Sequence, residues 1–309
     1  MSQNFRIGII GGTGLGDALI ENFNPRNTTT VRPDASGNPF GPPASPIILG
    51  EFDNTPVALL QRHGEHHLRN PAAVPYRANI FALKQLGCTH IIASGAVGSL
   101  REDIHPGSIV LCNQLIDKTD GRPRTFYENA AVHVEFADPF CPIMRQWLLN
   151  AGQSLPDQTI HSEGTYVCME GPSFSTRAEA EMHRQWGGDI IGMTACPEAR
   201  LAREAEMAYA LIALPTDYDC FKGRPLSASG DSGESGGSLI AEIIANLQKA
   251  TAASIALIKA ALNNTAMLQS TPSPAHEALT LAIWSDKSKI EPTEIKRLHP
   301  LWGRHFPEN

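Results

Sequence analysis

The sequence has no long apolar run and no excess of basic residues. Nothing in its 309 residues approaches the ~20 consecutive apolar residues of a membrane-spanning helix. The first residues also lack the charged start and apolar core of a signal peptide. Lys and Arg number 25 against 32 Asp and Glu, a net charge of −7, which argues against binding to the phosphate backbone of nucleic acid. We therefore expect a cytoplasmic protein whose partners include neither a membrane nor a nucleic acid.

Cysteine is also sparse, and no two cysteines form a CxxC pair. An even number of cysteines would permit disulfides, but this density is far below that of disulfide-stabilised secreted domains. We expect reduced, buried thiols at all six positions: Cys88, Cys112, Cys141, Cys168, Cys196 and Cys220.

Short apolar runs alternate with amphipathic stretches, which predicts an α/β fold. The expected strands are residues 5–10, 57–61, 90–94, 108–112, 165–169, 189–192 and 208–214, and the expected helices are residues 76–86, 177–186, 197–207 and 239–262. Residues 31–46 and 223–237 are rich in Gly, Pro or Ser and predict loops. We expect one domain over residues 1–264. Residues 265–309 would form a tail, with Trp284, Trp302 and Phe306, that packs on the core or on a neighbouring subunit.

Two glycine-rich turns follow predicted strands. Residues 11–16 read GGTGLG, with no Lys-Ser or Lys-Thr after them, and Asp17 stands where a dinucleotide fingerprint has its third glycine. The turn is therefore a weak cofactor signature, and its alternatives are a plain tight turn or an anion site built on N–H groups and Thr13. Residues 94–99 read SGAVGS. Turns at the carboxyl ends of strands are where α/β proteins bind ligands, so we expect these two to meet.

A histidine-rich segment, RHGEHH at residues 62–67, follows another strand. Its spacing is not the HExxH of a zinc protease, and adjacent side chains on an extended chain point to opposite faces. We therefore expect no metal here. The remaining alternatives are a surface loop and an anion site formed by Arg62 and His63, since Arg presents a fork that matches phosphate.

Four further residues are candidate ligand contacts. Phe174, in EGPSFSTR, and Met193, in GMT, are residue types that serve more often in a core than in a ligand site. Asp217 and Asp219, in TDYDC, lie at i and i+2 and would share one side of an extended backbone. They predict either a solvated turn or recognition of donors on a planar ring, with proton donation to it.

Several motifs taken together, in this order, resemble the trimeric purine nucleoside phosphorylases over about residues 5–262. They are GIIGGTGLGD, RHGEHH, ASGAVGSLRE, EGPSFSTRAE and GMTACPEARLARE. The resemblance implies a single α/β domain with a central mixed, barrel-like sheet flanked by helices. It also implies a homotrimer and a reaction with no metal or organic cofactor, in which inorganic phosphate is a co-substrate.

The resemblance also assigns roles to residues. Those implied to bind phosphate are Thr13, Arg62, His63, Gly95, Ala96 and Thr194, with Gly95 standing where the family usually has Thr. Those implied to bind the nucleoside are Phe174, Met193, Asp217, Asp219, His133 and Leu239. Asp217 would be the catalytic acid at purine N7, and Asp219 would accept from the 6-amino group. His133 would reach the site of a neighbouring subunit near the 5′ substituent, and Leu239 would line the methylthio group.

The pair Asp217 and Asp219 favours a 6-aminopurine over a 6-oxopurine as the base of the substrate. Carboxylates accept from a 6-amino group, whereas an Asn at the first position would favour a 6-oxopurine. The resemblance thus implies phosphorolysis of 5′-methylthioadenosine to adenine and 5-methylthioribose 1-phosphate, a step of purine and methionine salvage. The alternatives are a phosphorylase of 6-oxopurine nucleosides or methylthioinosine, an NAD-dependent oxidoreductase, and a catalytically silent nucleoside-binding protein.

Overall fold

A mixed β-sheet forms the centre of the computed structural model, which describes residues 5–13, 15, 18, 26–33, 37–222 and 234–307, with the backbone alone for 234–240, 242 and 243. The described strands run in the order β2-β3-β4-β1-β5-β10-β9-β7, and β11, β6 and β8 continue from β5. Their bounds are β1 (Ile7–Gly11), β2 (Arg26–Val31), β3 (Ile47–Phe52), β4 (Thr55–Gln61), β5 (His90–Ser99), β6 (Ile109–Leu111), β7 (Gln114–Lys118), β8 (Ile160–His161), β9 (Thr165–Met169), β10 (Ile190–Gly192) and β11 (Ala208–Tyr218).

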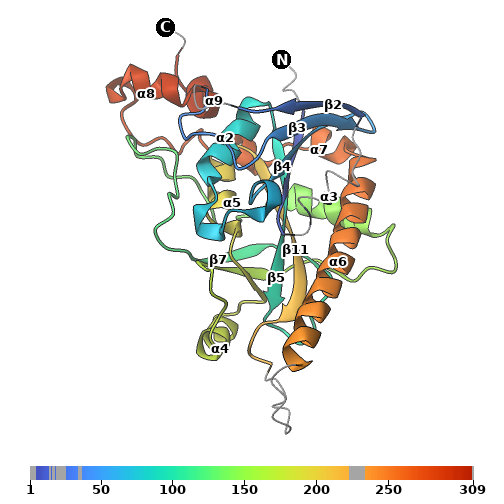
Figure 1. The fold of residues 1–309 in the computed structure, drawn as a ribbon. Helices are drawn as coiled ribbons and strands as arrows, with labels where there is room; N and C mark the ends of the chain where they lie inside the picture. The colour runs from blue at the N-terminus through green and yellow to red at the C-terminus, as the bar shows by residue number, and fades with distance from the viewer. Residues whose placement is uncertain are drawn as a thin grey trace.

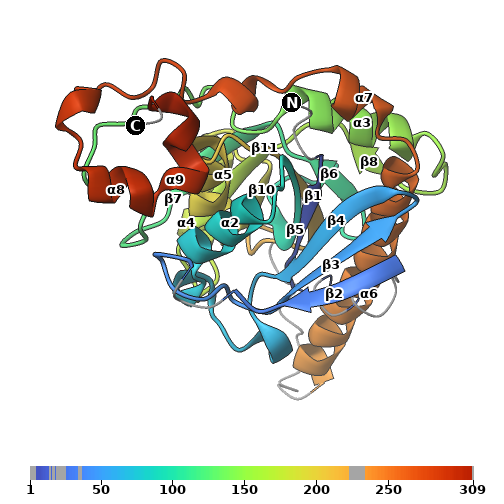
Figure 2. The same ribbon diagram turned by 90° about the horizontal axis from the view of Figure 1, so that it is seen from above.

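Helices cover both faces of this sheet, as predicted for an α/β fold (Figure 1). They are α2 (Tyr76–Gln85), α3 (Pro142–Gly152), α4 (Arg177–Gln185), α5 (Ala195–Glu204), α6 (Glu234–Leu262), α7 (Ala266–Ser270), α8 (Pro292–Arg297) and α9 (His299–Trp302). Figure 2 shows α2, α5, α8 and α9 on one side of the sheet and α3, α6 and α7 on the other. Within the described residues, no helix combines the length and apolarity needed to cross a bilayer.

Alternate side chains of the central strands pack in two separate hydrophobic cores, one on each face of the sheet. Along β11, Tyr209 and Leu211 pack in the core beneath α2 and α5, while Ala210 and Ile212 pack in the core beneath α3 and α6. Successive side chains of a strand point to opposite faces. Runs of consecutive apolar residues in the sequence therefore correspond to strands that are covered on both sides.

β5 is the strand from which the rest of the sheet branches. Its first half pairs in parallel with β1, from Ile7–His90 to Ile10–Ala93, and its second half pairs antiparallel with β10. On its other edge it pairs in parallel with β11 along almost its full length. The sheet therefore divides at the middle of β5, where the SGAVGS segment begins.

The structure corrects the predicted elements in several places. β5 and β11 extend well beyond residues 94 and 214, because their backbones stay paired up to Ser99 and Tyr218. No sequence pattern predicted β2, which is polar and largely exposed, nor β3, β7, β8 and α3. The predicted loop 223–237 is wrong for its last residues, since α6 begins at Glu234; residues 223–233 lie outside the described part. All six cysteines are free, and all except Cys220 are buried.

The C-terminal tail packs against the core of its own chain. Leu298, Leu301 and Trp302 belong to the same buried cluster as the apolar face of α2. The Trp302 side chain is fully buried, and its ring lies 4.8 Å from that of Tyr127 and 5.1 Å from that of Phe306. Trp284, by contrast, is 72% exposed.

Replacing Trp302 tests how much of the stability depends on this packing. Removing a fully buried aromatic side chain typically costs about 3–5 kcal/mol. We therefore expect Trp302→Ala to lower the free energy of unfolding by that amount in a denaturant titration, and Trp302→Phe to lower it by less. A Trp302→Ala protein with the wild-type midpoint would show that the tail contributes nothing to the folded core.

Candidate active site

One cavity of about 340 Å³ gathers the carboxyl ends of six strands. All of the predicted site residues except His133 and Leu239 line it: Thr13, Arg62, His63, Gly95, Ala96, Phe174, Met193, Thr194, Asp217 and Asp219. Gly95 and Ala96 lie within the second half of β5, and the others lie at or after the ends of β1, β4, β9, β10 and β11. The prediction that residues 94–99 form a turn is therefore wrong, since they belong to β5, but both glycine-rich segments line the same cavity, as expected.

Arg62 is the cation at one end of this cavity, and a buried carboxylate holds it. Its Nε and Nη2 each donate to Glu198, at 2.7 Å, and its Nη1 donates to the Ser94 carbonyl at 2.6 Å. Neither side chain of the pair is exposed. These bonds use three of the five guanidinium N–H groups, which leaves one on each terminal nitrogen for a ligand. Burial by itself would lower the pKa of Arg62, but the charge and hydrogen bonds of Glu198 raise it, so the guanidinium stays charged.

Gly12 makes this arrangement possible. A side-chain carbon at position 12 would lie 2.5 Å from the Ser94 carbonyl oxygen and 2.6 Å from Nη1 of Arg62. Only glycine lets the first turn approach Arg62 this closely. Gly12 thus serves close packing beside Arg62, in the part of the cavity (the anion corner) that Arg62 lines together with Thr13, His63 and Thr194.

His63 is neutral and presents an acceptor. Burial and the charge of Arg62 lower its pKa to about 4, and its Nδ1 lies 2.8 Å from the Arg69 carbonyl. Nδ1 therefore carries the hydrogen and donates it, which leaves Nε2 as an acceptor. The ring stacks on that of His67, with centroids 4.2 Å apart, and His67 also lines the cavity.

Thr194 and the SGAVGS segment complete the wall around Arg62. Thr194 is buried, and its backbone N–H donates to the Tyr166 hydroxyl at 3.4 Å. A side-chain carbon at Gly95 would meet Oγ1 of Thr194 at 3.5 Å, an ordinary contact. The glycine at this position is therefore not forced by packing.

Two aspartates stand at the other end of the cavity. Oδ2 of Asp217 accepts from the Thr216 hydroxyl at 2.8 Å, while Oδ2 of Asp219 is buried without any hydrogen-bond partner. Both side chains face Gly98 of β5, since a carbon built there would meet Asp219 Cβ at 3.3 Å and Asp217 Oδ1 at 3.4 Å. Burial raises the pKa of both carboxyl groups, and for Asp217 the nearby charge of Asp219 adds to the effect.

Phe174 and Met193 line the same cavity. Phe174 lines the cavity and is 84% exposed, so it is not a core residue. Met193 packs against Gly171, whose φ of +69° is in the left-handed region. Both side chains are placed to contact a ligand that spans the cavity.

The two remaining predicted residues lie elsewhere. His133 is exposed on a loop that pairs with the tail; its N–H donates to the Ala282 carbonyl, and its ring lies 4.6 Å from that of Trp284. It does not line the cavity of its own chain. The side chain of Leu239 lies outside the described residues, and the α6 residue seen to line the cavity is Leu247.

No signal in the sequence distinguished Glu198 or Leu247 from ordinary helix residues. Glu198 could have been noticed only as a carboxylate inside the apolar stretch TACPEA.

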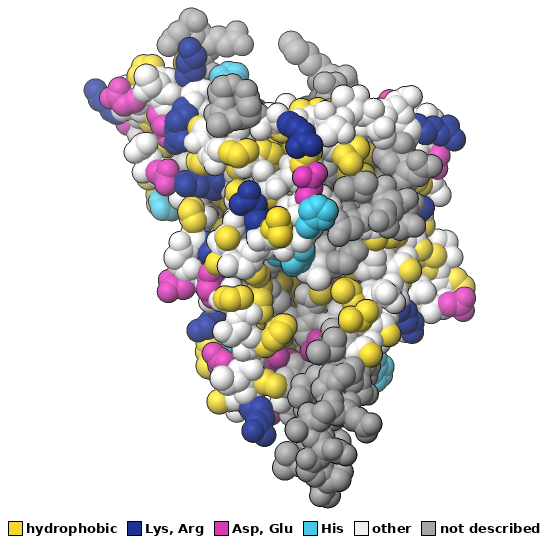
Figure 3. Space-filling model, in the orientation of Figure 1, with side chains coloured by type: hydrophobic (Ala, Val, Ile, Leu, Met, Phe, Trp, Pro, Cys, Tyr) yellow, Lys and Arg dark blue, Asp and Glu magenta, His cyan; other side chains and the backbone are white. Residues whose placement is uncertain are grey.

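Among the described side chains, no group of three or more His, Cys, Asp and Glu could hold a metal ion. On the face shown in Figure 3, acidic and basic side chains are interspersed, and two histidines lie near its centre.

Comparison with known proteins places the chain in a family. Residues 6–263 match the model of the phosphorylase superfamily, and the chain belongs to that superfamily. A relative named S-methyl-5′-thioadenosine phosphorylase, from Thermosynechococcus vestitus, is 41% identical over 97% of this chain and 99% of its own length.

Two solved structures extend this comparison. A methylthioadenosine phosphorylase from an Antarctic soil metagenomic library superposes with a TM-score of 0.83 at 42% identity, covering 96% of this chain and 98% of the other. The methylthioadenosine phosphorylase of Schistosoma mansoni, in complex with adenine, has a TM-score of 0.79 at 32% identity, covering 91% of this chain and 99% of the other.

The Arg62–Glu198 pair yields a prediction about anion binding. In Glu198→Gln the guanidinium loses its charge partner and one of its two acceptors, so its free N–H groups no longer have a fixed direction. We expect the KM for phosphate to rise at least ~10-fold, with a smaller change in the KM for the second substrate. Steady-state kinetics with phosphate as the varied substrate measure this.

Glu204→Gln is the matched control. Glu204 lies on the same helix, is also buried, and accepts from the Phe126 N–H rather than from Arg62. Its replacement should leave the KM for phosphate unchanged. Equal effects of the two substitutions would contradict the role assigned to Glu198.

Proposed function

We propose that the protein catalyses phosphorolysis of 5′-methylthioadenosine to adenine and 5-methylthioribose 1-phosphate, a pentosyl transfer that serves purine and methionine salvage. The observation that carries this proposal is the pairing, in one cavity, of an anion corner with two buried carboxyl groups, one of which has an oxygen without a donor. An adenine 6-amino group is a donor of the kind that Oδ2 of Asp219 lacks. Membership of the phosphorylase superfamily and the named relatives support the same reaction.

The anion corner suits inorganic phosphate. Arg62 supplies a fixed positive charge with two free N–H groups, and Thr13 and Thr194 supply hydroxyls. Because His63 is neutral and its Nε2 accepts, it can take a hydrogen bond from a protonated phosphate oxygen. Phosphate held there offsets the positive charge that develops on the ribose, and it is positioned as the nucleophile at C1′.

Asp217 provides the acid at the base. Cleavage of the N-glycosidic bond leaves negative charge on the purine, and a proton or hydrogen bond at N7 offsets it. The raised pKa of Asp217 increases the protonated fraction at neutral pH. Activity that needs this proton is present below the pKa and is lost as pH rises through it. General acid catalysis of this kind is worth ~10²–10⁴-fold.

Asp219 sets the preference for a 6-aminopurine. Its unpartnered Oδ2 is stabilised by an amino donor but faces an acceptor when the purine carries a 6-oxo group. The same reasoning disfavours 6-oxopurine nucleosides and methylthioinosine as substrates. Phe174 would pack on the base, Met193 on the ribose, and Leu239 on the methylthio group.

The assembly and location belong to the same proposal. A homotrimer would let the exposed His133 reach the 5′ substituent in a neighbouring cavity. Free, mostly buried thiols fit a cytoplasmic protein. The chemistry described above uses protein side chains and phosphate, with no metal or organic cofactor.

A phosphorolysis assay on four nucleosides tests the reaction and its specificity. The set combines a 6-amino or 6-oxo purine with a 5′-hydroxyl or 5′-methylthio group. We expect phosphate-dependent release of adenine, fastest from 5′-methylthioadenosine. Release without phosphate, or none from any of the four, would refute the proposal.

Asp217→Asn, in the same assay, tests the acid. We expect kcat for 5′-methylthioadenosine to fall ~10²-fold or more, the preference to shift towards 6-oxopurines, and the loss of wild-type activity at high pH to disappear. An unchanged pH profile would show that the titrating group is another one.

His133→Ala tests the contribution of a second subunit. Loss of one contact of hydrogen-bond strength predicts a ~10-fold lower kcat/KM in a protein that remains folded. Co-expression with the Asp217→Asn chain provides the decisive control, because a mixed trimer would then contain sites with an intact Asp217 from one chain and an intact His133 from another. Activity no higher than the average of the two variants would show that His133 does not act in the site of a neighbouring chain.

A further inference from the structure

We propose that Arg122 is a positioning residue of this active site, which fixes the two loops that contact the substrates without touching a substrate itself. The inference rests on the proposed function. Arg122 lies in the segment after β7, its side chain is 2% exposed, and it is absent from the lining of the cavity. The sequence marks it only as one of three arginines in residues 122–145.

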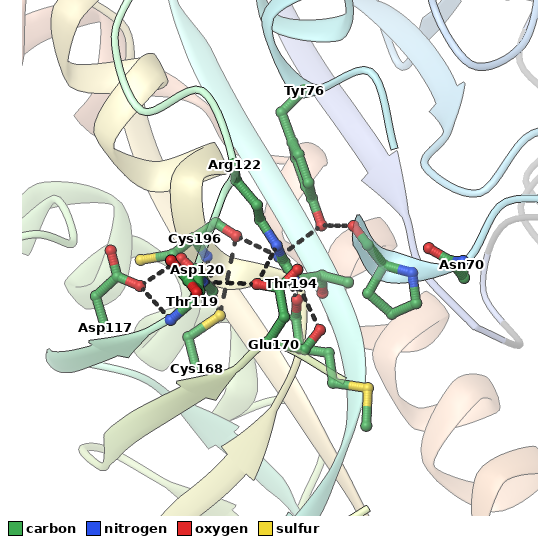
Figure 4. Close-up of polar contacts among 12 residues, drawn as sticks. Asn70, Tyr76, Asp117, Thr119, Asp120, Arg122, Cys168, Glu170, Thr194 and Cys196 are labelled. Carbon is green, nitrogen blue, oxygen red and sulfur yellow. Dashed lines mark hydrogen bonds and ion pairs between the residues drawn. The ribbon is translucent and has the colours of Figure 1, made fainter. Parts of the chain in front are cut away.

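The Arg122 guanidinium donates hydrogen bonds to backbone carbonyls of two separate loops. Its Nη1 donates to the carbonyls of Met193 at 2.7 Å and Cys196 at 2.8 Å, and its Nη2 donates to the carbonyl of Glu170 at 2.6 Å. Its Nε lies 2.9 Å from the Glu170 carboxylate. Figure 4 shows the side chain directed between Tyr76 on one side and Glu170 and Cys196 on the other.

These carbonyls flank the ligand-contacting residues. Met193 and Cys196 bracket Thr194, which belongs to the anion corner, and Glu170 directly precedes the loop that carries Phe174. The two loops also pack on each other, because Gly171 has no room for a side chain beside Met193. Movement of Arg122 would therefore displace the sugar contact, the phosphate contact and the base contact together.

A third wall of the cavity is tied to the same group. Nη1 of Arg122 lies 3.2 Å from the Tyr76 hydroxyl, which in turn donates to the carbonyl of Pro71, a residue that lines the cavity. Loops are held by few bonds of their own, and here one buried guanidinium donates to three carbonyls that belong to two loops. A lysine offers a single point charge and cannot reach all these acceptors at once.

Three substitutions at this centre separate positioning from plain stability. Arg122→Met keeps the length and removes every donor, and Arg122→Lys keeps the charge. Glu170→Gln keeps the backbone carbonyl bond and removes only the ion pair. Arg124→Met is the matched control, because Arg124 lies two residues away and its contacts are with Thr119 and Asp117 rather than with the cavity loops.

The measurements are kcat and both KM values, taken well below each variant's midpoint of thermal unfolding, and calorimetric binding of phosphate alone and adenine alone. A displacement of about 1 Å in a site can cost ~10²-fold. We expect Arg122→Met to lower kcat/KM by ~10²-fold and weaken binding of both ligands, with Arg122→Lys intermediate. Glu170→Gln and Arg124→Met should stay within about threefold of the wild type.

The kinetic and binding measurements on the Arg122 variants decide the positioning role. Folded Arg122→Met and Arg122→Lys proteins with wild-type kinetic constants and ligand binding, at whatever cost in thermal stability, would overturn the positioning role. If Arg122→Met fails to fold, Arg122→Lys decides the matter by the same criteria. Absence of turnover in the wild type refutes the proposed reaction instead, and the calorimetric comparison still decides whether Arg122 organises the cavity.

Discussion

The parallel pairing of β5 with β11 places the proposed phosphate-binding residues of β5 close to the aspartates at the end of β11. The ladder runs from Ala208–His90 to Tyr218–Ser99 and shifts register between Pro215 and Asp217. Gly95 and Ala96 on one strand thus lie within a few residues of Asp217 on the other. Because β1 leaves β5 at Ala93 and β10 joins it at Gly98, the sheet opens where these residues lie. The cavity at this point is lined by residues in or directly after these strands.

The proposed reaction requires opposite electrostatic states of Arg62 and Asp217, and the surroundings of each favour the state required. Arg62 must remain charged, and the buried Glu198 keeps it so. Asp217 must hold a proton, and burial beside Asp219 raises its pKa. The proposed role of Asp217 depends on this environment, since a guanidinium beside it would favour the ionised carboxylate, which has no proton to donate.

Features that follow from short local sequence patterns could be predicted, whereas features that depend on contacts between residues far apart in the sequence could not. The turn after β1, the aspartate pair and the alternation of strands and helices are local patterns, and the structure places them as predicted, whereas SGAVGS, predicted as a turn, is part of β5. Glu198 and Arg62 are 136 residues apart, and Arg122 and Cys196 are 74 apart. Their importance comes from which loops the fold brings together. β2 could not be predicted because its residues are polar and exposed, and it is a strand only because β3 offers an edge.

The predicted loop 31–46 and the C-terminal tail support the segment that carries Arg62. Within the predicted loop 31–46, the Ser45 hydroxyl accepts from the N–H of Gln61, the residue before Arg62, and Ala44 donates its N–H to the Asn79 side chain on α2. Phe40, in the same segment, packs on Phe81 of α2 and beneath Arg297 of the tail. Loop 31–46 and the tail therefore meet over α2, and together they connect the end of β4 to the outer layer of the molecule. Loops with few contacts open at low free-energy cost. The contacts of loop 31–46 and the tail therefore restrain the segment that carries Arg62 and His63, the residues proposed to bind phosphate.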